Sequence, residues 1–262
     1  MRVRGPARGG AHIGDPEGML RPMEPATVDT IPEDWQRGVV IVAHPDDIEY
    51  GCAAAVARWT TQGKDVRYVL ATSGEAGIEG LAPAECGPIR EEEERRSAAV
   101  VGVSEVEFLG HPDGRVEYGL GLRRSLAAAI RRHRPEFVIT MNHRETWAPG
   151  MRNSADHRAV GQAALDAVSD AANEWIFPEL SEPRWSGVRW VAVNVMVGVT
   201  HAVDVTETVD AAVASLSQHS RYLAELSGTS VAEQAAAQIA MATGPKEGFA
   251  AERAVGFELY TF

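Results

Sequence analysis

From Gly38 onward the sequence alternates short β-rich runs with helical patterns, and this alternation limits the fold more than any other feature. The β-rich runs are nearly continuous stretches of apolar residues, as expected for parallel strands that are covered on both faces. Strand-like runs that alternate with helical patterns are typical of βαβ units. We predict strands over 39–43, 66–72, 106–109 and 137–141, and helices over 53–62, 90–101 and 122–133. The sequence therefore predicts an α/β fold with a Rossmann-like, mostly parallel sheet flanked by helices.

The pattern changes after Asp156, where helices and strands no longer alternate regularly. This part of the sequence predicts an Ala-rich helix over 159–172, strands over 190–197 and 202–205, and helices over 206–226 and 230–242. We interpret it as a C-terminal elaboration of the same domain. The domain is predicted to span residues 38–262, and residues 1–37, rich in Gly, Pro and Arg, are predicted to form a partly ordered extension.

The composition limits the partners of the protein. The 262 residues carry a formal net charge of -12, and no basic run follows the pattern of a phosphate-binding surface, so nucleic acid and anionic membranes are disfavoured. Two cysteines are too few for a disulfide framework, and no apolar stretch approaches the roughly 20 residues of a membrane span. We therefore expect a cytoplasmic protein that acts on a small molecule, and the sequence leaves homo-oligomerisation open.

Two polar clusters follow predicted strands. The segment His-Pro-Asp-Asp at 44–47 ends the first strand, and Asp156 and His157 come after the strand over 137–141. Ligands of open α/β sheets collect outside the carboxyl ends of the strands. Alone, the first segment is explained equally well as a strand-to-helix turn with an N-capping Asp. Together, the two clusters favour a zinc site with open coordination positions, because zinc takes His and Asp ligands.

Five short segments in the order of the chain make a larger pattern, which extends over residues 39–226. They are Val42 to Asp47, Thr72 to Gly77, Ile89 to Glu93, Leu109 to Gly114 and Asp156 to Gly161. In these segments the sequence resembles the LmbE-like family, also called PIG-L after the N-acetylglucosaminylphosphatidylinositol deacetylases. The resemblance implies a zinc-dependent deacetylase with a Rossmann-like fold, acting on N-acetylglucosaminides or related amides.

The resemblance also implies the roles of the first cluster. It places the ligands of one zinc ion per chain on His44, Asp47 and His157, and the general base on Asp46. The chemistry agrees, since zinc activates water and polarises an amide carbonyl while a neighbouring carboxylate accepts the proton.

The sequence departs from the family at Ser154, where many members carry a second histidine three positions before the last ligand. Serine cannot act as an imidazolium would. The role is therefore empty, is filled by Asp46 returning its proton, or has moved. Among His201, His143 and Arg152, we take His201, just ahead of the strand over 202–205, as the first choice for a catalytic replacement.

Further substrate contacts are expected from residues on the same edge of the sheet. Glu75 follows the second strand and is as well explained by hydrogen bonds to backbone amides. Asp113 matches a family position that touches sugar hydroxyls, and Arg90 either binds an anionic substrate group or pairs with a neighbouring glutamate. With Arg152 and Ser154, the expected substrate-binding residues are Glu75, Arg90, Asp113, Arg152 and Ser154.

The function expected from these residues is N-deacetylation of an N-acetylglucosamine-type conjugate or a related secondary-metabolite intermediate. An amidase that cleaves a larger acyl group shares the same chemistry, and the volume of the pocket beside the metal would separate the two. A nucleotide-binding module is disfavoured, because the first strand lacks G-x-G-x-x-G. A non-catalytic homologue that binds a metal or ligand remains the alternative from another class, supported only by Ser154.

Overall fold

The computed structural model describes residues 27–262, which contain ten strands and eight α-helices with a short 3₁₀ helix. The strands are β1 (Asp29–Thr30), β2 (Arg37–Val42), β3 (Asp65–Leu70), β4 (Val106–Phe108), β5 (Phe137–Met141), β6 (Thr146–Ala148), β7 (Met151–Arg152), β8 (Trp190–Asn194), β9 (His201–Asp204) and β10 (Ala254–Thr261). The helices are α1 (Asp47–Gly51), α2 (Ala53–Thr61), α3 (Pro83–Val100), α4 (Leu120–His133), α5 (Ala155–Ala172), η1 (Thr206–Thr208), α6 (Val209–Leu216), α7 (Ser220–Leu226) and α8 (Val231–Ala242).

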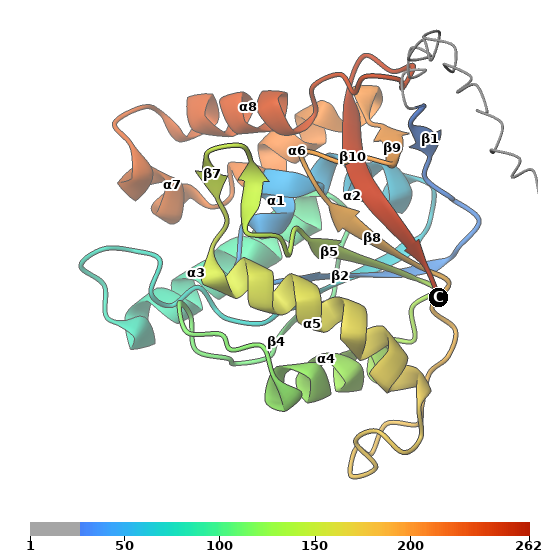
Figure 1. The fold of residues 1–262 in the computed structure, drawn as a ribbon. Coiled ribbons are helices and arrows are strands. Elements are labelled where there is room, and N and C mark those ends of the chain that lie inside the picture. The colour runs from blue at the N-terminus through green and yellow to red at the C-terminus, as the bar shows by residue number, and fades with distance from the viewer. Residues whose placement is uncertain (1–26) are drawn as a thin grey trace, which may run out of the picture.

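Eight of the strands form one sheet in the order β1-β9-β10-β8-β5-β2-β3-β4, and β6 and β7 form a separate hairpin. The neighbours from β8 to β4 pair in parallel, whereas β10 runs antiparallel to β8 and β9. The predicted Rossmann-like, mostly parallel sheet with a C-terminal elaboration is therefore confirmed. Helices α4 and α5 cover one face of the sheet, and α1, α6 and α8 lie on the other (Figure 1).

The central strands are buried because their sequences are apolar on both faces. In β2 and β5 every residue except Arg37 is buried. At one end of these strands, the ring of Trp35 stacks on Phe137 with 4.9 Å between centroids, and Trp59 meets both rings edge-on. The aromatic cluster packs the amino ends of the strands, so the carboxyl ends are left for the polar side chains.

Two expectations differ from the structure in detail. Residues 27–37, expected in the extension, join the domain, because Ile31 and Trp35 are buried and β1 pairs with β9. Residues 1–26 of that extension lie outside the described residues. The single helix expected over 206–226 is broken into η1, α6 and α7, and the break at 217–219 turns the buried His219 inward.

None of the helices in residues 27–262 is both long and apolar enough to cross a membrane.

Candidate metal centre

The site lies at the carboxyl ends of β2 and β5, where the strand order reverses. From β2 the sheet continues to β3 on one side and to β5 on the other. A crevice forms at such a reversal in open α/β sheets, and ligands bind there. Residues 44–46 form the turn between β2 and α1, Asp47 begins α1, and His157 lies in the first turn of α5. Two segments more than a hundred positions apart in the sequence thus meet at one edge.

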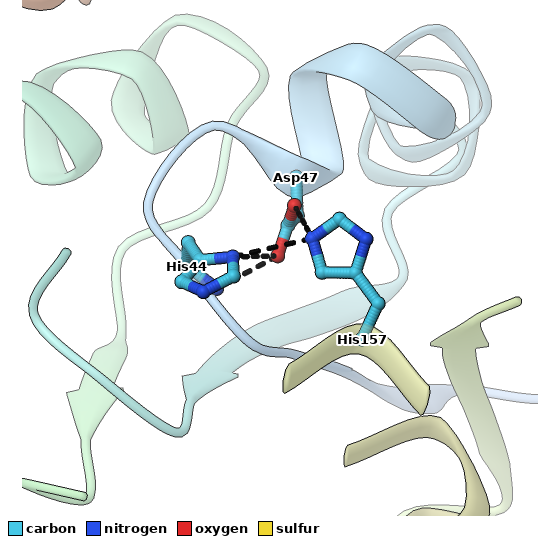
Figure 2. Close-up of side chains that lie close together, drawn as sticks. All are labelled: His44, Asp47 and His157. Atoms are coloured by element: carbon cyan, nitrogen blue, oxygen red, sulfur yellow. Dashed lines mark hydrogen bonds and ion pairs between the residues drawn. The ribbon is translucent and has the colours of Figure 1, made fainter. Parts of the chain in front are cut away.

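Three predicted ligand side chains point at one another from these two segments (Figure 2). His157 Nε2 lies 3.0 Å from Asp47 Oδ1, and His44 Nδ1 lies 3.2 Å from His157 Nε2 and 3.4 Å from Asp47 Oδ2. Donor atoms of a tetrahedral zinc site, each about 2.0–2.2 Å from the ion, are roughly 3.3–3.6 Å apart. The spacing and the donor set of two imidazoles and one carboxylate therefore fit a divalent metal ion.

The opposite ring nitrogens of the two histidines are held by further side chains. His44 Nε2 lies 3.2 Å from Asp113 Oδ1 and 3.3 Å from Asp156 Oδ2. His157 Nδ1 lies 3.0 Å from Asn153 Oδ1. Such contacts fix the orientation of metal-binding imidazoles. Asp156 and Asn153 were not among the predicted site residues, although Asp156 directly precedes a predicted ligand.

Charge within the site favours a cation. Burial disfavours the charged form of His44, but the carboxylates of Asp47, Asp113 and Asp156 outweigh it and raise the pKa of His44 to about 12. Burial likewise opposes ionisation of Asp47, yet the neighbouring His157 and His44 hold its pKa well below the usual range. Three carboxylates around two imidazoles make an environment that stabilises positive charge.

Asp46 lies beside the three donors but takes no part in their contacts. It is buried, and its backbone has φ of 100°, in the left-handed region that Asp and Asn enter more readily than other non-glycine residues. Its backbone N–H donates to Glu94 Oε2 at 3.1 Å, and its Oδ1 lies 3.4 Å from Arg90 Nη2. Burial raises the pKa of Asp46, and the positive charge of Arg90 opposes that rise.

Arg90 supports this turn and does not pair with the glutamates of its own helix. Its guanidinium, 2% exposed, donates to the carbonyl oxygen of Pro45 and stacks 3.5 Å over the ring of Tyr222. Arg90 was expected either to bind an anionic group or to pair with a glutamate of α3. Its partner is Asp46, because α3 lies against the turn after β2.

A fully buried group of Glu49, Glu94 and His219 lies behind Asp46. His219 Nε2 lies 3.5 Å from Glu49 Oε2 and 3.6 Å from Glu94 Oε2, and Ser97 and Ser215 donate to Glu49 Oε1. This group joins α1, α3 and the break between α6 and α7. It therefore connects the turn that carries Asp46 to the C-terminal helices.

The remaining predicted residues lie apart from the three donors. Glu75 Oε1 accepts a hydrogen bond from the Asp113 N–H at 2.8 Å, the backbone role that was its alternative. Ser154 is the N-cap of α5, accepting from the His157 N–H at 3.1 Å, and Arg152 is exposed in β7. Glu75 and Ser154 thus bind backbone near the site, and none of the three residues lines its cavity.

His201 is not brought to the site. It begins β9, which is separated from β2 by β10, β8 and β5, and its Nδ1 lies 2.9 Å from Thr200 Oγ1. The strand-like run that follows His201 is a strand as expected, but it sits near the far edge of the sheet. The choice of His201 as replacement for the missing histidine is therefore corrected, because the antiparallel β10 is inserted between β9 and β8.

A cavity of about 610 Å³ opens over the donors. Of the predicted site residues it is lined by His44, Asp46, Asp47, Arg90, Asp113 and His157. Trp147, on the hairpin of β6 and β7, also lines it and meets the His157 ring edge-on, with centroids 5.7 Å apart. The three candidate ligands and the carboxylate of Asp46, which is not one of them, therefore line the same cavity.

Comparisons with known proteins agree with this arrangement. The model of the PIG-L family, described as GlcNAc-PI de-N-acetylase, matches residues 39–168. Diacetylchitobiose deacetylase of Thermococcus kodakarensis is 32% identical over 140 residues, which are 53% of this chain and 51% of that protein. The chain thus matches about half the length of that relative.

The uncharacterized deacetylase YaiS of Escherichia coli is 31% identical over 134 residues, which are 50% of this chain and 68% of YaiS. Among solved structures, N,N'-diacetylchitobiose deacetylase from Pyrococcus horikoshii shares the fold with a TM-score of 0.76 and 21% identity, covering 87% of this chain and 85% of that one. With its motifs, donors and fold in agreement, the chain belongs to the PIG-L family.

Proposed function

We propose that the protein is a zinc-dependent hydrolase that removes the acyl group from the nitrogen of an N-acylated amino sugar, in particular an N-acetylglucosamine-type conjugate. One observation carries the proposal: a buried carboxylate, Asp46, lines the same cavity as three converging metal donors without belonging to them. Relatives described as deacetylases of acetylated sugars support the substrate class.

The residues of the site fall into two groups, those that would bind the metal ion and the one that transfers a proton. His44, Asp47 and His157 would hold one zinc ion, which supplies Lewis acidity toward the amide carbonyl and the attacking water. Asp113, Asp156 and Asn153 keep the two imidazoles in the orientation that binding requires. The coordination set is complete without Asp46, so that carboxylate is free for proton transfer.

Asp46 acts as the general base. It accepts the proton from water as the water oxygen bonds to the amide carbon, and it returns the proton to the nitrogen as the carbon–nitrogen bond breaks. The products are a carboxylic acid and a free amine. Because Ser154 caps α5 and His201 lies elsewhere, this return by Asp46 fills the role of the absent second histidine.

Arg90 and Glu94 keep Asp46 in place. Glu94 accepts the Asp46 N–H and Arg90 holds both the carboxylate and the Pro45 carbonyl. These contacts stabilise a left-handed backbone that otherwise costs free energy. Residues 27–262 would then work as one catalytic domain. The buried Cys52 and Cys86 form no disulfide, which fits a reducing compartment such as the cytoplasm.

The test combines metal analysis with product release. The purified chain, reconstituted with zinc, should hold about one ion per chain, and it should release acetate from N-acetylglucosamine or di-N-acetylchitobiose. The control is the variant Asp47→Asn, which removes one charged ligand and should lose both zinc and acetate release. Zinc bound at one ion per chain without hydrolysis of any N-acyl amino sugar would refute the proposal.

A further inference from the structure

The cavity over the metal donors continues well beyond them in one direction. On one side of His44 it is bounded by polar groups and glycines, among them Asp113 and Gly114. On the other side it runs between the strand ends of β2, β5 and β8 and the helices α1 and α8. We call this second part the acyl pocket, and its apolar wall consists of Val40, Val42, Ile139, Met141, Val195 and Ala242.

Three polar side chains that line the acyl pocket donate hydrogen bonds to backbone carbonyls. Asn194 Nδ2 donates to the Gly256 oxygen at 3.1 Å, and Gln238 Nε2 donates to the Tyr50 oxygen at 3.2 Å. The ammonium of Lys246 donates to the oxygens of Ala242 and Gly244 at 3.3 and 3.0 Å. These bonds turn part of the polar groups toward the protein backbone, and the rest of the pocket surface is mainly carbon.

The mouth of the cavity is also apolar. Met151, Met196 and Met241 line it and are 45%, 47% and 55% exposed. They come from β7, from the loop after β8 and from α8, so they surround the opening from three separate elements. Methionine is flexible and adapts to varied apolar partners, and apolar side chains gathered at one opening mark a binding surface.

The size of the cavity exceeds what an acetyl group needs. A volume of about 610 Å³ corresponds to roughly twenty water molecules at about 30 Å³ each. This volume belongs to the whole cavity, which also has to take the metal ion and the sugar. An acetyl group offers only one methyl beyond the carbonyl carbon, so it would contact little of the apolar wall. A longer chain attached to the same carbonyl would reach into the acyl pocket and cover more of its apolar wall.

We propose that the acyl pocket selects amino-sugar amides whose N-acyl group is an apolar chain longer than acetyl. The inference rests on the proposed function and deepens it. Hydrolysis then gives a free fatty acid and an amino sugar, by the same addition of water to the amide. Binding of the chain stabilises the transition state as well as the ground state, so the preference appears in kcat/KM.

The first experiment varies chain length on the zinc-loaded protein. N-acetyl-, N-butanoyl- and N-hexanoylglucosamine should show kcat/KM rising by about fourfold per added methylene. The comparison compound is the hexyl glycoside of N-acetylglucosamine, which carries an apolar chain of similar length on the other side of the sugar. A flat or falling series overturns the proposal, and so does a gain from the hexyl glycoside equal to that from the hexanoyl group.

The second experiment fills the pocket from α8. Ala242→Phe places a ring in the acyl pocket, whereas Ala240→Phe adds the same ring at an exposed position of the same helix that does not line the cavity. Ala242→Phe should lower the hexanoyl-to-acetyl ratio of kcat/KM at least tenfold, and Ala240→Phe should keep the parental ratio. An unchanged ratio in folded Ala242→Phe overturns the proposal. If Ala242→Phe does not fold, the exposed Met241→Asp provides the same comparison.

Binding to the metal-free protein separates failure of this inference from failure of the proposed function. Calorimetric titration should show N-hexanoylglucosamine binding at least tenfold more tightly than N-acetylglucosamine. Equal affinities for the two compounds overturn the proposed selection by the acyl pocket, even if acetate is released. Tighter hexanoyl binding without hydrolysis after zinc loading supports the pocket and refutes the hydrolase.

Discussion

Replacing Asp46 by Asn tests whether Asp46 is the general base, because the change removes the base and keeps the shape of the side chain, although buried Arg90 then faces a neutral amide. Asn has nearly the shape of Asp and also enters the left-handed backbone region, so the turn with φ of 100° should persist. The hydrogen bond from the residue 46 N–H to Glu94 is unaffected, and His44, Asp47 and His157 are intact. Zinc should therefore remain bound.

The expected loss is that of a general base, a factor of about 10²–10⁴ in kcat with little change in KM. This corresponds to about 3–5 kcal/mol of transition-state stabilisation. The assay measures kcat on an N-acylglucosamine alongside zinc per chain. Asp34→Asn is the control, since it removes the same charge at an exposed residue that pairs with Arg189. A zinc-loaded Asp46→Asn protein with parental kcat would show that Asp46 serves only the turn.

Three further changes probe the ligands, the corrected histidine and the packing behind the site. His157→Ala should abolish both zinc binding and turnover, because only two of three protein donors remain; metal analysis showing a full ion would contradict this. His201→Ala should alter kcat by no more than about twofold, as expected for a substitution far from the site, and a large loss would restore its catalytic role. Gly161→Ala should lower the free energy of unfolding by about 1–3 kcal/mol, because its Cβ would lie 2.5 Å from the Met141 oxygen and 3.0 Å from His143 Cβ; denaturant unfolding at parental stability would refute the clash.

Continuous apolar runs made the strands of the sheet predictable. The predicted limits of β5 match the structure, and β2 and β3 differ by one or two residues at their ends. The start of α5 was predicted late, because Asp156 and His157 interrupt the apolar pattern of its first turn. The break before α7 was missed since the apolar spacing continues through it, whereas burial of His219 against two glutamates depends on tertiary contacts.

The same limit applies to the site. The ligands and Asp46 stand in two short motifs, so their roles could be proposed from local sequence and family resemblance. The pairing of Asp46 with Glu94 spans 48 positions, and that of His44 with Asp156 spans 112. Such contacts are set by how α3 and α5 pack on the sheet, which no local pattern encodes. The predicted catalytic role of His201 was wrong for this reason, because the order of the strands in the sheet could not be predicted from their spacing in the sequence.

The order of strands in the sheet also bears on how the protein behaves at high concentration. Within residues 27–262 the two outer strands are the short β1, with two residues, and β4, with three. Glu107 in β4 is engaged by Arg132 and His133, so charged side chains flank that border. Short, charged borders offer few free backbone groups for pairing with another molecule. The longer apolar strands are enclosed between neighbours, and the native sheet is thereby protected against edge-to-edge aggregation.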